Sequence, residues 1–165
     1  MQQANPGLTA LLHDTIGDGW IKDASKLKKL EKFKNDSAVL ERLEKVKYEN
    51  KLRLAEYIRT SNGVVVNPDS IFDIQAKRLH EYKRQLLNAM NILDTYYTLK
   101  ENPALDICPR TYVFGAKAAS SYYMAKQIIR LIWQLGEVIN NDKSIDDKLK
   151  VVFLENYRVS LAEIM

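Results

Sequence analysis

The sequence predicts an α/β fold with a parallel sheet, preceded by a helical extension. From residue 64 onward, short segments rich in β-branched and aromatic residues alternate with longer segments whose apolar residues recur near the helical period of 3.6. Before residue 64, only helical patterns occur. Because a β-α-β-α-β-α order implies parallel strands with right-handed crossovers, we expect a partial Rossmann-like domain over 64–165 and a helical extension over 1–63.

The extension contains three predicted helices. The first covers Leu8–Ile16 between glycine-containing turns, and the second covers Ser25–Phe33. The third has Asp36 or Ser37 as its N-cap and ends before Gly63. The second helix is basic, as a nucleic-acid or membrane surface would be. Its apolar residues repeat at every third position, however, which favours a short amphipathic helix packed on the sheet.

The α/β part contains three predicted strands and the helices that connect them. A strand at Ile71–Ala76 precedes a helix at Glu81–Lys100, and a strand at Thr111–Phe114 precedes a helix at Ser120–Asn140. A third strand follows at Val151–Leu154, and one further helix begins after it. The helix over 120–140 is apolar nearly all round, which predicts deep burial. The helix over 81–100 has one apolar face, formed by Leu86, Leu87, Met90, Leu93 and Tyr97.

Composition bounds the class of protein. The 165 residues are 46% hydrophobic and 28% charged, and the net charge of +4 is compatible with an anionic ligand. Cys108 is the single cysteine, so we expect no internal disulfide, no metal cluster and a reduced, intracellular setting. No apolar run approaches the ~20 residues of a membrane helix, and the N-terminus lacks a signal-peptide pattern.

Cations follow each predicted strand. Lys77, Arg78 and Lys83 come after the first strand, Lys117 after the second and Arg158 after the third. Ligands of open parallel sheets bind outside the carboxyl ends of the strands, and the N-terminus of the following helix favours an anion. This placement predicts a phosphate-sized anion site. Charge spacing alone leaves two alternatives open: an ordinary solvated strand end, and a non-catalytic module that binds RNA or another polyanion.

Four segments of the chain resemble the α-glucan phosphorylases, the family of glycogen and maltodextrin phosphorylases. They are NPGL at 5–8, FDIQAKRLHEYKRQLL at 72–87, TYVFGAKAASSYYMAKQIIRLI at 111–132 and KLKVVFLENYRVSLAE at 148–163. The similarity covers nearly the whole chain, in order and without a large gap. Ala116, Ser120-Ser121 and Tyr123 stand where the family usually has a second glycine, Pro-Gly and histidine, so the shape of that loop is left open.

The resemblance implies a part of the C-terminal catalytic domain of a GT-B glycosyltransferase. Parent enzymes of this family cleave terminal α-1,4-glucosidic bonds of a glucan with inorganic phosphate and release glucose 1-phosphate. They use pyridoxal phosphate, whose phosphate group acts as a proton donor or shuttle. The resemblance further implies a cytoplasmic homodimer of carbohydrate metabolism that binds neither nucleic acid nor membrane.

The resemblance also implies roles for five residues. Arg78 would bind the substrate phosphate, while Lys77 and Lys83 would neutralise the paired phosphates of cofactor and substrate. Tyr82 would lie near the bound sugar, and Tyr157 would line the cofactor pocket. Because two phosphates in contact repel each other, fixed cations must offset the repulsion, and the reaction is expected to depend on Arg78 and Lys83. The family's cofactor-linked lysine follows shortly after this sequence ends, so we expect the chain by itself to be inactive.

Overall fold

The computed structural model describes residues 2–145 and 147–165. It divides into two compact units: the residues up to Arg53 form one together with Ile164, and Leu54–Glu163 form the other together with Met165. The division falls within the long helix α2, Ser37–Asn62. The domain boundary predicted at residue 63, directly after the last residue of this helix, stays a prediction.

The first unit consists of short helices whose starts follow local capping rules. Helix α1 covers Pro6–Ile16, and the Asn5 side chain accepts a hydrogen bond of 3.0 Å from the Leu8 amide at its first turn. After α1 come η1, Gly19–Ile21, and η2, Ala24–Phe33. The predicted helix at 25–33 is therefore confirmed, but as a 3₁₀ helix.

The 3₁₀ geometry of η2 explains why its apolar residues recur at every third position. A 3₁₀ helix has three residues per turn, so residues spaced by three lie in one column. Leu27, Leu30 and Phe33 form such a column and are half-buried, whereas the lysines between them are exposed. Helix η2 packs against α1 and η1 within its own unit.

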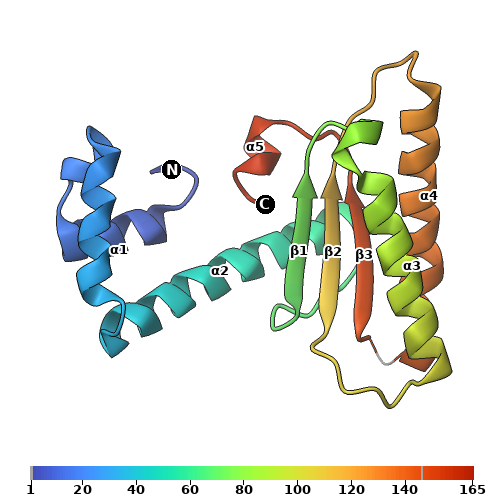
Figure 1. The fold of residues 1–165 in the computed structure, drawn as a ribbon, viewed down its shortest axis with the longest axis horizontal. Helices are drawn as coiled ribbons and strands as arrows, with labels where there is room; N and C mark the ends of the chain where they lie inside the picture. The colour runs from blue at the N-terminus through green and yellow to red at the C-terminus, as the bar shows by residue number, and fades with distance from the viewer. Residues whose placement is uncertain (1, 146) are drawn as a thin grey trace. The chain divides into compact units, whose positions relative to one another are not determined.

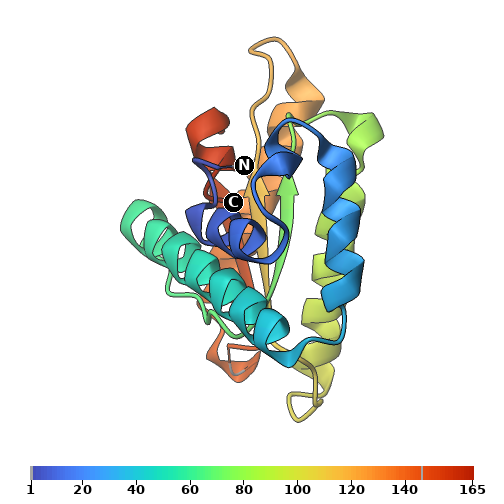
Figure 2. The ribbon, with the colours of Figure 1, turned by 90° about the vertical axis from the view of Figure 1, so that its left-hand side faces the viewer.

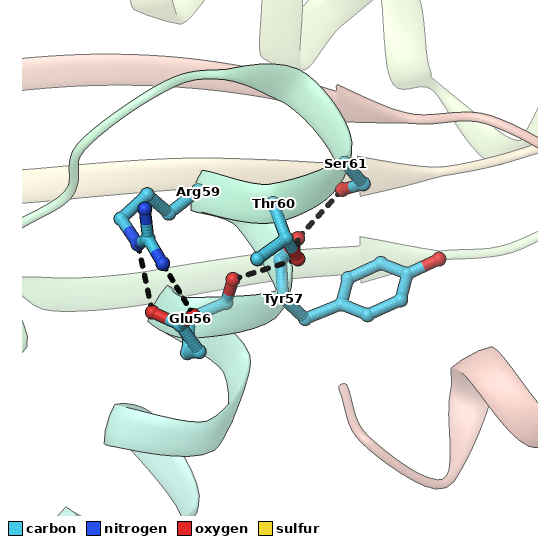
Figure 3. A network of polar contacts seen from close by, with 5 residues as sticks. All are labelled: Glu56, Tyr57, Arg59, Thr60 and Ser61. Carbon is cyan, nitrogen blue, oxygen red and sulfur yellow. Dashed lines mark hydrogen bonds and ion pairs between the residues drawn. The ribbon is translucent and has the colours of Figure 1, made fainter.

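Both predicted ends of α2 are confirmed. The Asp36 carboxylate accepts a hydrogen bond of 3.1 Å from the Val39 amide, as an N-cap does. At the other end, Gly63 has a φ of 70° and donates its amide to the Arg59 carbonyl. The last turns of α2 belong to the second unit, and the Thr60 and Ser61 hydroxyls bond back to helix carbonyls there (Figure 3).

The second unit is built on three parallel strands, as predicted. These are β1, Ile71–Ala76; β2, Arg110–Gly115; and β3, Leu149–Leu154, in the order β1-β2-β3. In the register of the sheet, Ile74 lies opposite Val113, and Val113 lies opposite Val152. The carboxyl ends of all three strands therefore meet at one edge (Figure 1).

Two helices cover one face of the sheet. They are α3, Gln85–Glu101, and α4, Tyr123–Asn140. The last turns of α2 and the short α5, Val159–Ala162, lie on the other face (Figures 1 and 2). Both α3 and α4 begin later than predicted, because the residues before them form separate turns. In front of α3, these turns are the 3₁₀ helix η3, Glu81–Lys83, and a left-handed Arg84.

The apolar face that the sequence predicted for α3 is mostly exposed, and of its five residues only Leu93 is partly buried against the core. Leu86, Leu87, Met90 and Tyr97 are 39–62% exposed. The helix instead buries a second stripe of similar spacing, formed by Ala89, Ile92, Tyr96 and Leu99, with Tyr96 partly buried. Because α3 carries apolar residues on two sides, its period alone could not decide which side meets the sheet.

The predicted burial of α4 on all sides is also wrong. Ile128, Ile132 and Leu135 are buried in the core, whereas Trp133 and Val138 are 54% and 57% exposed. The helix is amphipathic, with one face toward β2 and β3 and the other toward solvent. Tyr112, Phe114, Leu149 and Val151 supply the strand side of this core.

Helix α4 closes the outer edge of β3. The Asn140 side chain donates to the Val151 carbonyl at 2.8 Å and accepts from the Val151 amide at 2.9 Å. Asn62 donates to the Phe153 carbonyl at 3.0 Å. Gly136 faces the same strand, and a Cβ there would lie 2.9 Å from the Val151 oxygen, so only glycine permits this close approach.

Candidate anion-binding site

The first two strands continue side by side into their loops. The Lys77 amide donates to the Gly115 carbonyl at 3.1 Å, and the Leu79 amide donates to the Lys117 carbonyl at 3.0 Å. These bonds extend the pairing of β1 and β2 beyond the strand ends. The cations that follow the two strands are thereby held next to each other.

Two cavities that share Lys83 lie at this edge. Arg78, Lys83 and Lys117 line a cavity of about 390 Å³. Lys77, Tyr82 and Lys83 line a second one of about 680 Å³ beside β1. The structure therefore brings together four of the five cations that the sequence placed at the carboxyl ends of the strands, together with Tyr82.

Arg158 lines neither of these two cavities. Its guanidinium donates to the Ser160 hydroxyl at 3.0 Å and to the Asn156 carbonyl at 3.4 Å, and it lines a separate hollow of about 290 Å³. Asn156 has a φ of 53°, which turns the chain directly after β3. The expectation that all five cations share one rim is therefore wrong for Arg158.

Tyr157 lies across the ends of the first two strands. It is half-buried, and its hydroxyl donates a long hydrogen bond of 3.5 Å to the Ala76 carbonyl. A Cβ on Gly115 would lie 3.1 Å from the Tyr157 ring and 2.9 Å from the Met165 side chain. Gly115 therefore leaves room for Tyr157 to reach over the end of β2.

The grouped cations are not neutralised by the protein. Within residues 2–145 and 147–165, neither Lys77, Arg78, Lys83 nor Lys117 forms an ion pair with a carboxylate. The Lys83 ammonium donates to the Arg78 carbonyl at 3.1 Å and lies 5.5 Å from the centre of the Tyr82 ring. Like charges held close together without counter-charges repel each other, and a bound anion relieves that repulsion.

An aromatic and acidic cluster ties the two loops together above the first cavity. The His80 ring lies 4.4 Å from the Tyr82 ring and 5.3 Å from the Tyr122 ring, centre to centre. The Tyr122 hydroxyl donates to the Glu81 carboxylate at 2.5 Å. This hydrogen bond raises the pKa of Tyr122 above its usual value. Sequence reasoning missed the partnership of Tyr122 and Glu81, because no local pattern links residues so far apart.

Neither a candidate metal cluster nor an apolar helix of membrane-spanning length occurs among the described residues. No group of three or more His, Cys, Asp or Glu side chains is arranged to hold a metal ion among them. Within the same residues, no helix is long and apolar enough to cross a membrane.

Fold and site together define a Rossmann-like α/β domain with a basic rim at the carboxyl ends of its first two strands. The chain belongs to the carbohydrate phosphorylase family, whose family model matches residues 1–165. It is 50% identical over 159 residues to human liver glycogen phosphorylase and 51% identical over 161 residues to Bacillus subtilis glycogen phosphorylase. These matches cover 96% and 98% of this chain but only 19% and 20% of the relatives. The chain thus spans about a fifth of their length.

Proposed function

We propose that this chain forms the phosphate-binding part of an α-glucan phosphorylase. The parent enzyme cleaves terminal α-1,4-glucosidic bonds with inorganic phosphate and releases glucose 1-phosphate, in glycogen or maltodextrin breakdown. One observation carries this proposal: Lys77, Arg78, Lys83 and Lys117 line two cavities with a shared wall and have no carboxylate partner among the described residues. Family membership gives this cluster its chemistry.

Each residue of the cluster has a distinct part in this proposal. Arg78 binds the substrate phosphate, because a guanidinium can grip phosphate with two parallel hydrogen bonds. Lys77 and Lys83 neutralise a pair of phosphates, which would otherwise repel each other. Tyr82 lines the same cavity as these two lysines and contacts the sugar. When the glycosidic bond breaks, the charge that develops at the sugar is stabilised by the phosphate that this cluster holds.

The residues present fit the phosphate end of pyridoxal phosphate. Lys77 and Lys83 line one cavity and can hold a phosphate, and Tyr157 lies at the strand ends above Gly115. Lys150, the last lysine of the sequence, is paired with Asp147 at the other end of β3. We propose that the lysine that carries the aldehyde belongs to another part of the parent polypeptide. When bound, the cofactor phosphate supplies a proton donor or shuttle.

The parent enzyme is proposed to be a cytoplasmic homodimer, in line with the resemblance of the whole chain to the family. The alternative of an RNA-binding or other polyanion-binding module gains no support. A polyanion surface needs cations spread along an extended track, whereas four cations here gather around two cavities.

An amide NMR titration of the chain with inorganic phosphate, and then with glucose 1-phosphate, tests the site. Shifts should be confined to residues near 77–83 and 117–122. Arg78→Ala should weaken binding about 10- to 100-fold, as expected for losing a hydrogen bond to a charged group. Arg130→Ala, which removes an exposed arginine on α4, is the matched control. Diffuse shifts that salt abolishes would contradict a localised phosphate site.

The activity is tested in a full-length enzyme. We expect Bacillus subtilis glycogen phosphorylase to release glucose 1-phosphate when this chain replaces its matching segment, and to lose that activity with Arg78→Ala. The 165-residue chain alone should release none. A folded but inactive exchange enzyme would argue against the proposed activity, and phosphorolysis by the isolated chain would show that it contains a complete site.

A further inference from the structure

We propose that Gln85 is a positioning residue that fixes the main chain of Lys77–His80, the segment that carries Lys77 and Arg78. The inference rests on the proposed phosphate-binding function of this segment and assigns the element that keeps it in place. Gln85 itself faces no cavity of the site, so its action is through the backbone of its neighbours.

The Gln85 side chain is buried beneath the segment and bonded to three of its backbone groups. It is 2% exposed, which is unusual for a polar side chain. Its amide nitrogen donates to the Arg78 carbonyl at 3.3 Å and to the Lys77 carbonyl at 3.5 Å. Its amide oxygen accepts from the His80 amide at 3.5 Å. These are long hydrogen bonds, and all of them end on the segment 77–80.

A side-chain amide is suited to make this set of bonds. An amide donates through its nitrogen and accepts through its oxygen at the same time, whereas an ionised carboxylate only accepts and an apolar side chain does neither. Gln85 must donate to two carbonyls and accept from one amide. The donor and acceptor atoms of the Gln85 amide therefore match the Lys77 and Arg78 carbonyls and the His80 amide.

A left-handed turn at Arg84, the residue directly before Gln85, places the Gln85 side chain beneath the segment 77–80. Arg84 has a φ of 59° and a ψ of 30°, a left-handed conformation that residues other than glycine adopt uncommonly. This turn separates η3 from α3 and makes Gln85 the first residue of the new helix. Backbone strain of this kind persists where the surrounding structure fixes it, and it clusters at functional sites.

Two further contacts hold the end of the same loop. The Lys83 ammonium is a second donor to the Arg78 carbonyl. The Gln75 side chain donates to the Lys83 carbonyl at 3.4 Å, and its oxygen accepts from Asn88 at 3.0 Å. Losing the Gln85 amide would leave backbone groups of the segment without a partner. The segment would then shift toward water, and its cations would lose their fixed arrangement.

The first test compares Gln85→Met with Gln134→Met. Methionine keeps the length of the side chain and removes the amide, and Gln134 is an exposed glutamine on α4. Gln85→Met should weaken inorganic phosphate binding at least about tenfold, equivalent to the loss of one or two hydrogen bonds. It should also lower the ¹⁵N order parameters of the 77–80 amides. Gln134→Met should change neither quantity.

Gln85→Glu is a second variant that tests the positioning role even if Gln85→Met fails to fold. A protonated glutamic acid can donate a hydrogen bond and an ionised one cannot, and burial favours the protonated form. The order parameters of the 77–80 amides, taken relative to wild type at the same pH, should therefore recover at pH values near 5 and fall near 8. Wild type and variant share the ionisable groups near the loop, including His80 and Glu81, so a comparison at equal pH cancels their contribution. A purely structural role would give no such recovery.

The outcomes separate the two proposals. If wild type fails to bind phosphate but Gln85→Met or Gln85→Glu loosens the 77–80 amides, the proposed site fails and the positioning role stands. If wild type binds phosphate and Gln85→Met binds it equally well with unchanged order parameters, the site stands and the positioning role is overturned. Unchanged order parameters in both variants overturn the positioning role whether or not phosphate binds.

Discussion

The outer side of β3 and the rim beyond β1 and β2 use polar residues in opposite ways. On the β3 side, Asn140 pairs with both backbone groups of Val151, and the Lys150 ammonium pairs with Asp147. At the rim, four cations lie around two cavities, and within the described residues none has a carboxylate partner. The polar groups on the β3 side are paired within the protein, whereas the charges at the rim remain available to bind an anion.

Whether a polar group has a partner within the protein distinguishes residues that stabilise the fold from residues that can bind a ligand. Closing an edge strand with side chains stabilises it and blocks pairing with another chain. Grouping like charges without counter-charges does the reverse, because it costs stability until an anion binds. Substitutions on the β3 side should therefore change mainly stability, and substitutions at the rim should change mainly anion binding.

Gly136→Ala should have the largest effect on stability. The added methyl group would lie 2.9 Å from the Val151 carbonyl oxygen, so α4 and β3 would have to move apart. Overpacking of this kind costs about 1–3 kcal/mol of the free energy of unfolding, measured by chemical denaturation. Gln134→Ala, at an exposed position of the same helix, should be nearly neutral. Equal stability of Gly136→Ala and wild type would mean that the β3 side is not tightly closed.

Asn140→Ala should come next. It removes the two hydrogen bonds to Val151, at about 1 kcal/mol each, so the free energy of unfolding should fall by about 1–2 kcal/mol. Asn141→Ala is the control, because the Asn141 side chain donates to the Glu137 carbonyl within its own helix end and not to β3 among the described residues. The exposed edge of β3 should also promote self-association, visible as concentration-dependent sedimentation. Equal free energies of unfolding and equal sedimentation of the two variants would contradict the proposed role of Asn140.

Acid should weaken the contact between α3 and the turn after α4 through Asp142. Hydrogen bonds from Ser144 and Tyr96, together with Lys100, hold the pKa of the Asp142 carboxyl well below its ordinary value. A lowered folded-state pKa contributes stability above the unfolded pKa of about 4, and that contribution is lost as the pH falls through the folded pKa. Asp142→Asn should therefore lose less stability than wild type between about pH 6 and pH 3 in denaturation experiments. Parallel pH profiles would contradict this.

Charge removal at the rim should have the smallest effect, of the opposite sign. Lys117→Gln should raise the free energy of unfolding slightly at low salt, by under about 0.5 kcal/mol, because it reduces repulsion among the cations. High salt should erase the gain by screening, and added phosphate should stabilise wild type more than the variant. A destabilisation as large as that of Gly136→Ala would mean that Lys117 holds the fold.

The sequence predicted the strands well, and it predicted in large part which cations gather at their carboxyl ends. Strand segments have a distinct local composition, so Ile71–Ala76 was located to the residue, and the other two strands were located within two residues at either end. The parallel order then placed Arg78 and Lys117 at one edge without any knowledge of contacts. Arg158 was misplaced, because a left-handed Asn156 turns its loop away, and no composition signal announced that turn.

The sequence by itself determined the element order, the parallel sheet and the segments that mark the phosphorylase family, because these depend on local period and residue type. Only the tertiary structure decided which face of α3 is buried, since both of its apolar stripes fit a helix. It also decided that Gln85 lies beneath the loop and that Asn62 bonds Phe153. Such contacts join residues from different elements, and they exist only once the chain has brought those elements together.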